Sequence, residues 1–162
     1  MKENIIFDFN RIPEETKFNT RLMVNLTADT NTKEVGKPLN VAVVLDRSGS
    51  MNGEPLHYVK MATKVLANQL NPDDRFSITM YDSSIDTLIK PTLMQDIRSL
   101  DAVIDTIEAG GMTFLSGGYE KGCQDAKEYV SKDTITRVML LTDGLANEGI
   151  TNPDQLAQLA FN

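Results

Sequence analysis

The segment Asn40-Val41-Ala42-Val43-Val44-Leu45 runs directly into Asp46-Arg47-Ser48-Gly49-Ser50, and it is the clearest indication of the fold. The first of these two pieces is a continuous apolar run, which is typical of a central strand that is covered on both faces. The second piece consists of residues that favour loops. The stretch therefore predicts a buried strand whose carboxyl end opens into a polar loop.

Downstream of this stretch, segments with the period of a strand alternate with segments with the period of a helix. This order predicts an α/β fold, a doubly wound and mainly parallel sheet flanked by helices. The first helix should begin near Pro55, and its expected apolar face is Leu56, Val59, Ala62, Leu66 and Leu70. The other expected elements are strands at 76–81, 85–90 and 138–141, and helices at 97–107, 119–130 and from 152 onward.

The first 38 residues differ from the rest of the chain. Strand-like runs at 4–9 and 20–26 are separated and followed by polar turn residues. We therefore expect residues 1–38 to form an N-terminal β-strand extension and residues 39–162 to form the α/β domain.

The composition limits the chemistry of the chain. Its 162 residues include 16 Lys plus Arg and 23 Asp plus Glu, a net charge of −7, which argues against a nucleic-acid binder. The single cysteine, Cys123, and the single histidine, His57, exclude metal clusters built from those residue types. No apolar run is long enough for a transmembrane segment or a signal peptide, and both a cytoplasmic and a cell-surface location remain open.

Carboxylates and hydroxyls gather where two apolar strands are expected to end. Asp46 follows one such strand directly, Asp143 follows the other after Thr142, and ligands bind beyond the carboxyl ends of strands in folds of this kind. Ser48 and Ser50 alternate with Asp46, so in an extended loop all three side chains could converge. Thr113 adds a hydroxyl just before a helix. Such oxygen ligands suit Mg²⁺, Mn²⁺ or Ca²⁺, but the same residues are also common as helix caps and turn formers.

The sequence resembles the von Willebrand factor type A domain. The resemblance rests on 43–51, on Thr113 in a glycine-rich loop and on 140–144, which match in order the three loops of that family's metal-ion-dependent adhesion site. The segments 53–56 and 70–75 resemble the subgroup found in bacterial proteins and in inter-alpha-trypsin-inhibitor heavy chains.

The resemblance implies a function and a role for each site residue. Ser48, Ser50 and Thr113 would supply hydroxyl oxygens to Mg²⁺ or Mn²⁺, and Asp46 and Asp143 would act through bound water. The domain would be a protein-binding module rather than an enzyme, and the ion would capture an Asp or Glu carboxylate of a partner protein. Relatives of this kind also continue past residue 162. We therefore expect a C-terminally truncated domain whose 138–141 strand lies at a sheet edge, open to strand exchange or self-association.

Two other functions stay open on the residues alone. The first is a Mg²⁺-dependent hydrolase or phosphatase, although the sequence has no Gly-x-Ser-x-Gly elbow, no P-loop and no plausible base for Ser48 or Ser50. The second is a subunit of an intracellular assembly with an ATPase or a chelatase, a binding function that the motif does not distinguish from adhesion.

Overall fold

A computed structural model describes residues 2–7, 22–27, 36–143 and 146–159. The chain divides into two compact units, Met1–Gly36 and Lys37–Asn162. In the first unit, strands β1 (Lys2–Phe7) and β2 (Leu22–Thr27) form an antiparallel pair. They overlap the runs predicted at 4–9 and 20–26, of which residues 8–9 and 20–21 lie outside the described residues.

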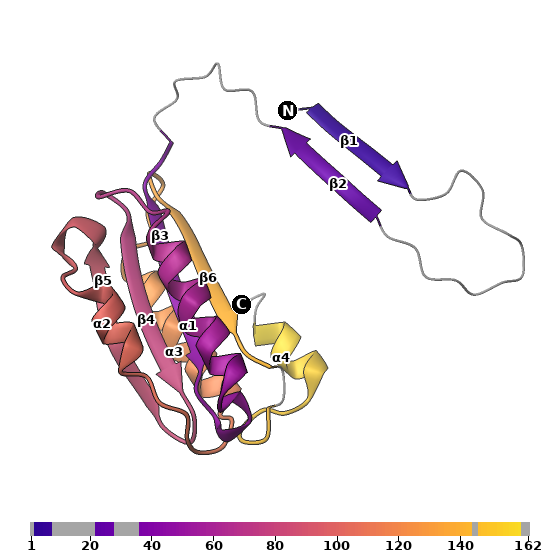
Figure 1. Cartoon of the computed structure of the whole chain (residues 1–162), viewed down its shortest axis with the longest axis vertical. Helices are drawn as coiled ribbons and strands as arrows, with labels where there is room; N and C mark the ends of the chain where they lie inside the picture. The colour runs from indigo at the N-terminus through magenta and orange to yellow at the C-terminus, as the bar shows by residue number, and fades with distance from the viewer. Residues whose placement is uncertain (1, 8–21, 28–35, 144–145, 160–162) are drawn as a thin grey trace, which may run out of the picture. The chain divides into compact units, whose positions relative to one another are not determined.

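The second unit contains a four-stranded sheet (Figure 1). Its order is β5 (Ile85–Leu93), β4 (Arg75–Tyr81), β3 (Leu39–Asp46) and β6 (Ile135–Leu141). Strand β3 pairs in parallel with both β4 and β6, and β5 runs antiparallel to β4. The predicted α/β fold with a mainly parallel sheet is confirmed, and β6 lies at an edge of the described sheet as expected.

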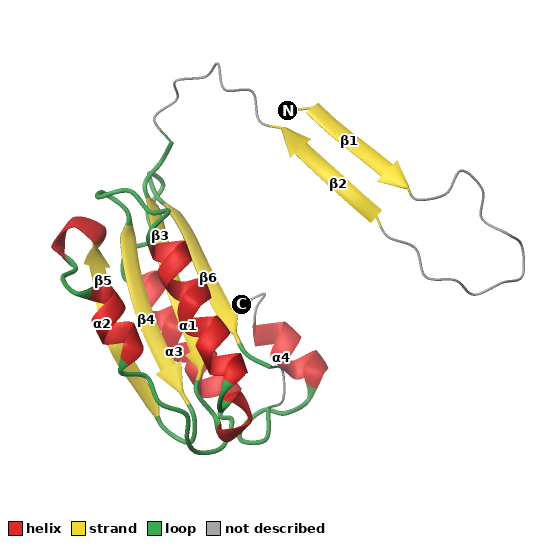
Figure 2. Ribbon diagram, viewed as in Figure 1, coloured by secondary structure: helices red, strands yellow, loops and turns green. Residues whose placement is uncertain are grey.

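Helices cover both faces of this sheet (Figure 2). Helices α1 (Glu54–Ala67) and α2 (Leu100–Asp105) pack on the face that carries Val41, Val43 and Leu45. Helix α3 (Leu115–Lys127) packs on the opposite face, and α4 (Pro153–Leu159) follows β6 in the chain. Because β3 alternates its side chains between two covered faces, Val43 and Val44 are both fully buried, and each contributes about 1.5–3 kcal/mol.

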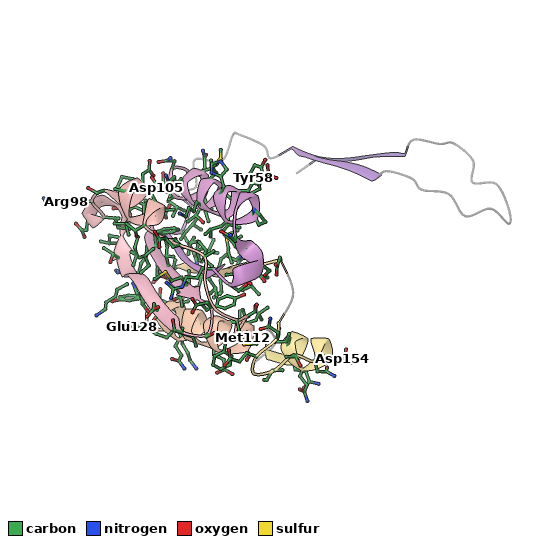
Figure 3. The ribbon with its side chains drawn as sticks, turned by 60° about the horizontal axis from the view of Figure 1, so that its bottom comes forward. Tyr58, Arg98, Asp105, Met112, Glu128 and Asp154 are labelled. Atoms are coloured by element: carbon green, nitrogen blue, oxygen red, sulfur yellow. The ribbon has the colours of Figure 1, made fainter. Side chains whose placement is uncertain are left out.

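The predicted apolar face of α1 was wrong at Ala62, and the helix ends at Ala67, before the predicted Leu70. Ala62 is exposed, whereas Thr63 and Ala67 lie in the core beside Leu56. Thr63 tolerates burial because its hydroxyl donates a 2.8 Å hydrogen bond to the Val59 carbonyl. The outer face of α1 carries exposed side chains such as Tyr58, labelled in Figure 3.

Two other helices differ from the predicted ranges. Helix α2 begins at Leu100 rather than at Ile97, because Ser99 has a left-handed backbone, with φ of 54°, that a continuous helix does not allow. Helix α3 begins at Leu115, four residues before the expected start at Tyr119, and buries Gly118 and Gly122 on its inner face. Within the described residues no helix has the length and apolar character needed to cross a membrane.

Candidate metal centre

The ends of β3 and β6 lie side by side at the carboxyl edge of the sheet. Leu45 pairs with Leu141 in parallel register, so the residues that follow each strand become neighbours. The Thr142 hydroxyl donates a 2.7 Å hydrogen bond to Oδ2 of Asp46. Two loops that are 96 residues apart in the sequence therefore meet at the carboxylate of Asp46.

Asp46 is fully buried and accepts several hydrogen bonds. Its Oδ1 accepts the Ser48 backbone N–H at 2.8 Å, and its Oδ2 also accepts the Tyr81 hydroxyl at 3.1 Å. Burial is the main cause that raises the pKa of Tyr81 far above its usual range, and the charges of Asp46 and Asp143 act in the same direction. Tyr81 therefore remains protonated and keeps donating to Asp46.

The structure brings Ser48 and Ser50 together, but not through the expected extended loop. The chain turns into a short 3-10 helix at Gly49–Met51, which places the Ser48 and Ser50 hydroxyl oxygens 3.1 Å apart. Ser48 is buried and Ser50 is exposed. The pair therefore has one side in the protein and one side toward solvent.

Residues 47–51 form the serine loop. Two backbone hydrogen bonds join it to the loop that contains Thr113. The Gly49 N–H donates to the Gly111 carbonyl at 3.0 Å, and the Gly110 N–H donates to the Arg47 carbonyl at 2.8 Å. Gly111 has a positive φ of 61°, and a Cβ there would lie 3.0 Å from Asp82, so glycine is needed at this contact. Thr113 itself is buried.

Asn147 is a supporting residue that the sequence analysis missed. Its side-chain Oδ1 accepts the Thr113 N–H at 2.7 Å, and its own backbone N–H donates to the Thr113 carbonyl at 3.2 Å. The segment after β6 therefore fixes Thr113 from the other side. The only signal in the sequence is the turn composition of Asn147-Glu148-Gly149, in which Gly149 has a φ of 72°.

Arg47 is a second residue whose role was not predicted. Its Nη2 lies 2.7 Å from Asp86, its Nε lies 3.3 Å from Asp82, and Nη2 also donates to the Ser84 hydroxyl at 3.0 Å. These contacts tie the serine loop to the turn between β4 and β5. Nothing in the local sequence around Arg47 indicates which carboxylates it contacts.

The two serine hydroxyls are spaced as neighbouring ligands of a hard divalent cation would be. Mg²⁺ binds octahedral oxygen ligands at 2.0–2.1 Å, so neighbouring ligands are about 3.0 Å apart, close to the 3.1 Å between Ser48 and Ser50. Within the described residues, no group of three or more His, Cys, Asp or Glu side chains could hold a metal. Any ion here would therefore depend on hydroxyl oxygens, and the exposed Ser50 and Asp143 mark its solvent side.

Comparison with known proteins gives the family. The family model for the von Willebrand factor type A domain matches residues 40–161. The chain belongs to this family. Von Willebrand factor type A domains are generally metal-dependent adhesion or protein-interaction modules.

The relatives agree with the subgroup named above. An uncharacterized protein of Synechocystis sp. is 33% identical over 129 residues, covering 80% of this chain and 30% of that protein. Inter-alpha-trypsin inhibitor heavy chain H4 of Bos taurus is 29% identical over 124 residues, covering 72% of this chain and 14% of that protein. The chain thus spans less than a third of the length of these relatives.

Solved structures show the same fold. A von Willebrand factor type A protein from Catenulispora acidiphila has a TM-score of 0.64 at 21% identity, covering 76% of this chain and 30% of that one. Proximal thread matrix protein 1 from the mussel byssus, with a zinc-occupied adhesion-site motif, has a TM-score of 0.59 at 20% identity, covering 76% and 35%.

Proposed function

We propose that this chain is a metal-dependent protein-binding module that captures an acidic side chain of a partner. Ser48, Ser50 and Thr113 provide hydroxyl oxygens to a divalent cation, and Asp46 and Asp143 act through bound water. The observation that supports this most directly is the pair of serine hydroxyls 3.1 Å apart beside a buried carboxylate.

The side chains around the centre have separate tasks in this proposal. Asp46 orients the serine loop through the Ser48 N–H, and Asn147 orients Thr113. A cation bound mainly by neutral hydroxyls keeps much of its charge and would supply an electrophilic position for a partner's Asp or Glu oxygen. Ser50 and Asp143 are exposed, so a partner can approach from their side.

Mg²⁺ or Mn²⁺ is the proposed ion, with Ca²⁺ as the alternative hard cation. The five residues offer oxygen donors alone, whereas Zn²⁺ and copper favour nitrogen and sulfur. Zinc occupies the corresponding motif in the mussel byssus protein. Zn²⁺ therefore belongs in any competition experiment.

A hydrolase mechanism has less support from the geometry. A serine nucleophile needs a base within hydrogen-bond distance. Among the described residues, the Ser48 hydroxyl makes its side-chain hydrogen bond with another hydroxyl, that of Ser50. His57, the one imidazole in the chain, is exposed on α1. We therefore propose binding rather than catalysis.

The first test is calorimetric titration of the whole chain with Mg²⁺, Mn²⁺, Ca²⁺ and Zn²⁺. Ser50→Ala and Asp143→Asn should each abolish or strongly weaken binding of the preferred ion. Both residues are exposed, so their replacement should leave the fold intact. Asp46→Ala is a poorer test, because it would leave the Ser48, Tyr81 and Thr142 donors without their acceptor, at about 1–3 kcal/mol each.

Asp133→Asn is the matched control, because Asp133 lies before β6, at the opposite end of that strand from Asp143. A second pair of variants tests the hydroxyl itself. Thr113→Val keeps the shape and should lose the ion, whereas Thr113→Ser keeps the oxygen and should retain it. Wild-type affinity in Ser50→Ala, Asp143→Asn and Thr113→Val would contradict the proposed ligand set.

A further inference from the structure

The carboxyl edge of the sheet, where β3, β4 and β6 end and where the proposed centre lies, is strongly acidic. Its described loops and element ends lie at 46–54, 81–86, 106–114, 142–143 and 146–152. They contain seven carboxylates and one guanidinium, a formal charge of −6, which a divalent cation would reduce to −4. The charged residues are Asp46, Glu54, Asp82, Asp86, Glu108, Asp143 and Glu148, with Arg47 as the one cationic side chain.

The one cation at this edge is already engaged. Arg47 forms ion pairs with Asp82 and Asp86 at 3.3 and 2.7 Å. Two of the remaining carboxylates, Glu54 and Glu108, are exposed and have no ion pair among the described residues. We call the charged loops at this edge the rim of the centre. An approaching partner therefore meets negative charge at the rim without a compensating cation.

Glu148 strengthens the negative charge close to the centre. Its backbone N–H donates to the carbonyl of Thr113 at 3.2 Å, so its backbone lies next to that of a proposed ligand residue. Its Oε2 is inaccessible to solvent and has no hydrogen-bond partner among the described residues. A buried carboxylate oxygen without a donor favours cations nearby, because burial removes the water that would otherwise solvate it.

The opposite edge of the sheet differs. Its described loops, at 36–38, 68–74, 94–99 and 128–134, carry five carboxylates and three cations, a formal charge of −2. The cations there are Lys37, Arg98 and Lys132. The excess of negative charge is therefore a property of the edge with the proposed centre and not of the whole surface.

We infer that the partner presents its captured carboxylate between cationic side chains. The inference rests on the proposed function and adds the charge of the partner's flanking residues. A carboxylate flanked by neutral or acidic residues would be repelled by the rim before it reached the ion. A carboxylate flanked by Lys or Arg is attracted instead, because those cationic side chains come within the Debye length of the rim carboxylates. The Debye length is about 10 Å at 0.1 M salt.

Three synthetic peptides test this inference on the whole chain with saturating Mg²⁺. The first is Gly-Lys-Gly-Glu-Gly-Lys-Gly, and all three are N-acetylated and C-amidated, so that the Glu side chain is the one carboxylate. The second has Gln in place of both Lys, and the third keeps both Lys but has Gln in place of Glu. We expect the first peptide to bind roughly tenfold more tightly than the second at low salt, since each surface ion pair adds up to about 1 kcal/mol. The advantage should disappear at 1 M salt, where the Debye length is about 3 Å.

Charge-neutralising variants of the rim locate the effect. Glu54→Gln/Glu108→Gln should remove most of the lysine advantage, while Mg²⁺ affinity measured by calorimetry stays near that of the wild type. Asp73→Asn/Asp133→Asn removes the same charge from the opposite edge and should leave the advantage unchanged. Both pairs replace exposed side chains, so neither should disturb the fold.

The outcomes separate this inference from the proposed function. Equal affinity for the first two peptides, or an advantage that survives 1 M salt or the rim variant, would overturn the inference and leave carboxylate capture standing. Equal affinity for the first and third peptides would overturn carboxylate capture, while a lysine advantage would still support the charged rim. No binding of any peptide at millimolar concentration would overturn both.

Discussion

Asp82 shows how single side chains hold the loops of the centre together. Its Oδ1 accepts the Ser84 N–H and hydroxyl at 2.7 and 3.0 Å, and its backbone carbonyl accepts the Phe114 N–H at 3.0 Å. Burial alone would raise the pKa of Asp82, but the hydrogen bonds from Ser84 and the charge of Arg47 outweigh it and lower the pKa below its usual range.

A lowered pKa makes the contribution of Asp82 to stability dependent on pH. The ionised carboxylate stabilises the fold fully above the unfolded-state pKa, about 3.9, and this contribution is lost as the pH falls through the lower folded-state pKa. Asp82→Asn should therefore reduce the free energy of unfolding at pH 7 by about 1 kcal/mol, and the difference should shrink as the pH falls below 4. Urea unfolding across this range measures it.

The exposed Asp133→Asn variant is the control for this measurement, since its unfolding free energy should follow that of the wild type at every pH. A deficit of Asp82→Asn that persisted unchanged at pH 2 would show that the carboxylate charge is not what stabilises this turn.

At the scale of elements, α3 packs on the sheet through two glycines as well as through Leu115, which lies in the same buried cluster as Val44 and Tyr81. A Cβ at Gly122 would lie 2.2 Å from Cγ2 of Val44, and one at Gly118 would lie 2.4 Å from Cδ1 of Tyr81. Together with Ala126 these residues form a small-residue stripe with a spacing of four. The close approach leaves Val44 and Tyr81 completely buried.

This packing predicts that Gly122→Ala destabilises the protein. In an exposed helix the same change would stabilise by about 1 kcal/mol, but here the overpacking against Val44 should cost about 1–3 kcal/mol net. Thermal or urea unfolding shows directly whether the variant is less or more stable than the wild type. Gly36→Ala, where a Cβ meets no atom within 4 Å, should have little effect. A Gly122→Ala variant as stable as the wild type would mean that α3 can move away from β3 at no cost.

At the scale of the whole molecule, we propose that residues 1–38 are a separate β-strand extension of the domain formed by 39–162. The compact unit Lys37–Asn162 contains all five proposed site residues and both described hydrophobic cores. A chain without residues 1–36 should therefore unfold cooperatively and bind the preferred ion with the affinity of the whole chain. Calorimetry and urea unfolding of the two chains make the comparison, and loss of either property would show that the first unit supports the second.

Much of the fold follows from local patterns in the sequence. The apolar run at 40–45 indicated a strand covered on both faces, and the structure confirms it, because continuous apolar side chains are stable only where both faces of a sheet are covered. The inner face of α3 was only partly predictable in this way. The predicted Ala126 is buried there, but so are Gly118 and Gly122, which carry no apolar signal, whereas the predicted Tyr119 and Cys123 are only partly buried.

For the candidate site, too, the residues could be predicted from the sequence but their contacts could not. The loops that carry carboxylates and hydroxyls can be identified from the sequence, because the residues that end a parallel strand are local to that strand. The folded chain was needed to show that a 3-10 turn joins Ser48 to Ser50, that Asn147 holds Thr113, and that Arg47 is paired. The last two contacts join residues more than thirty positions apart. Their geometry depends on strand register and helix packing, which no local pattern contains.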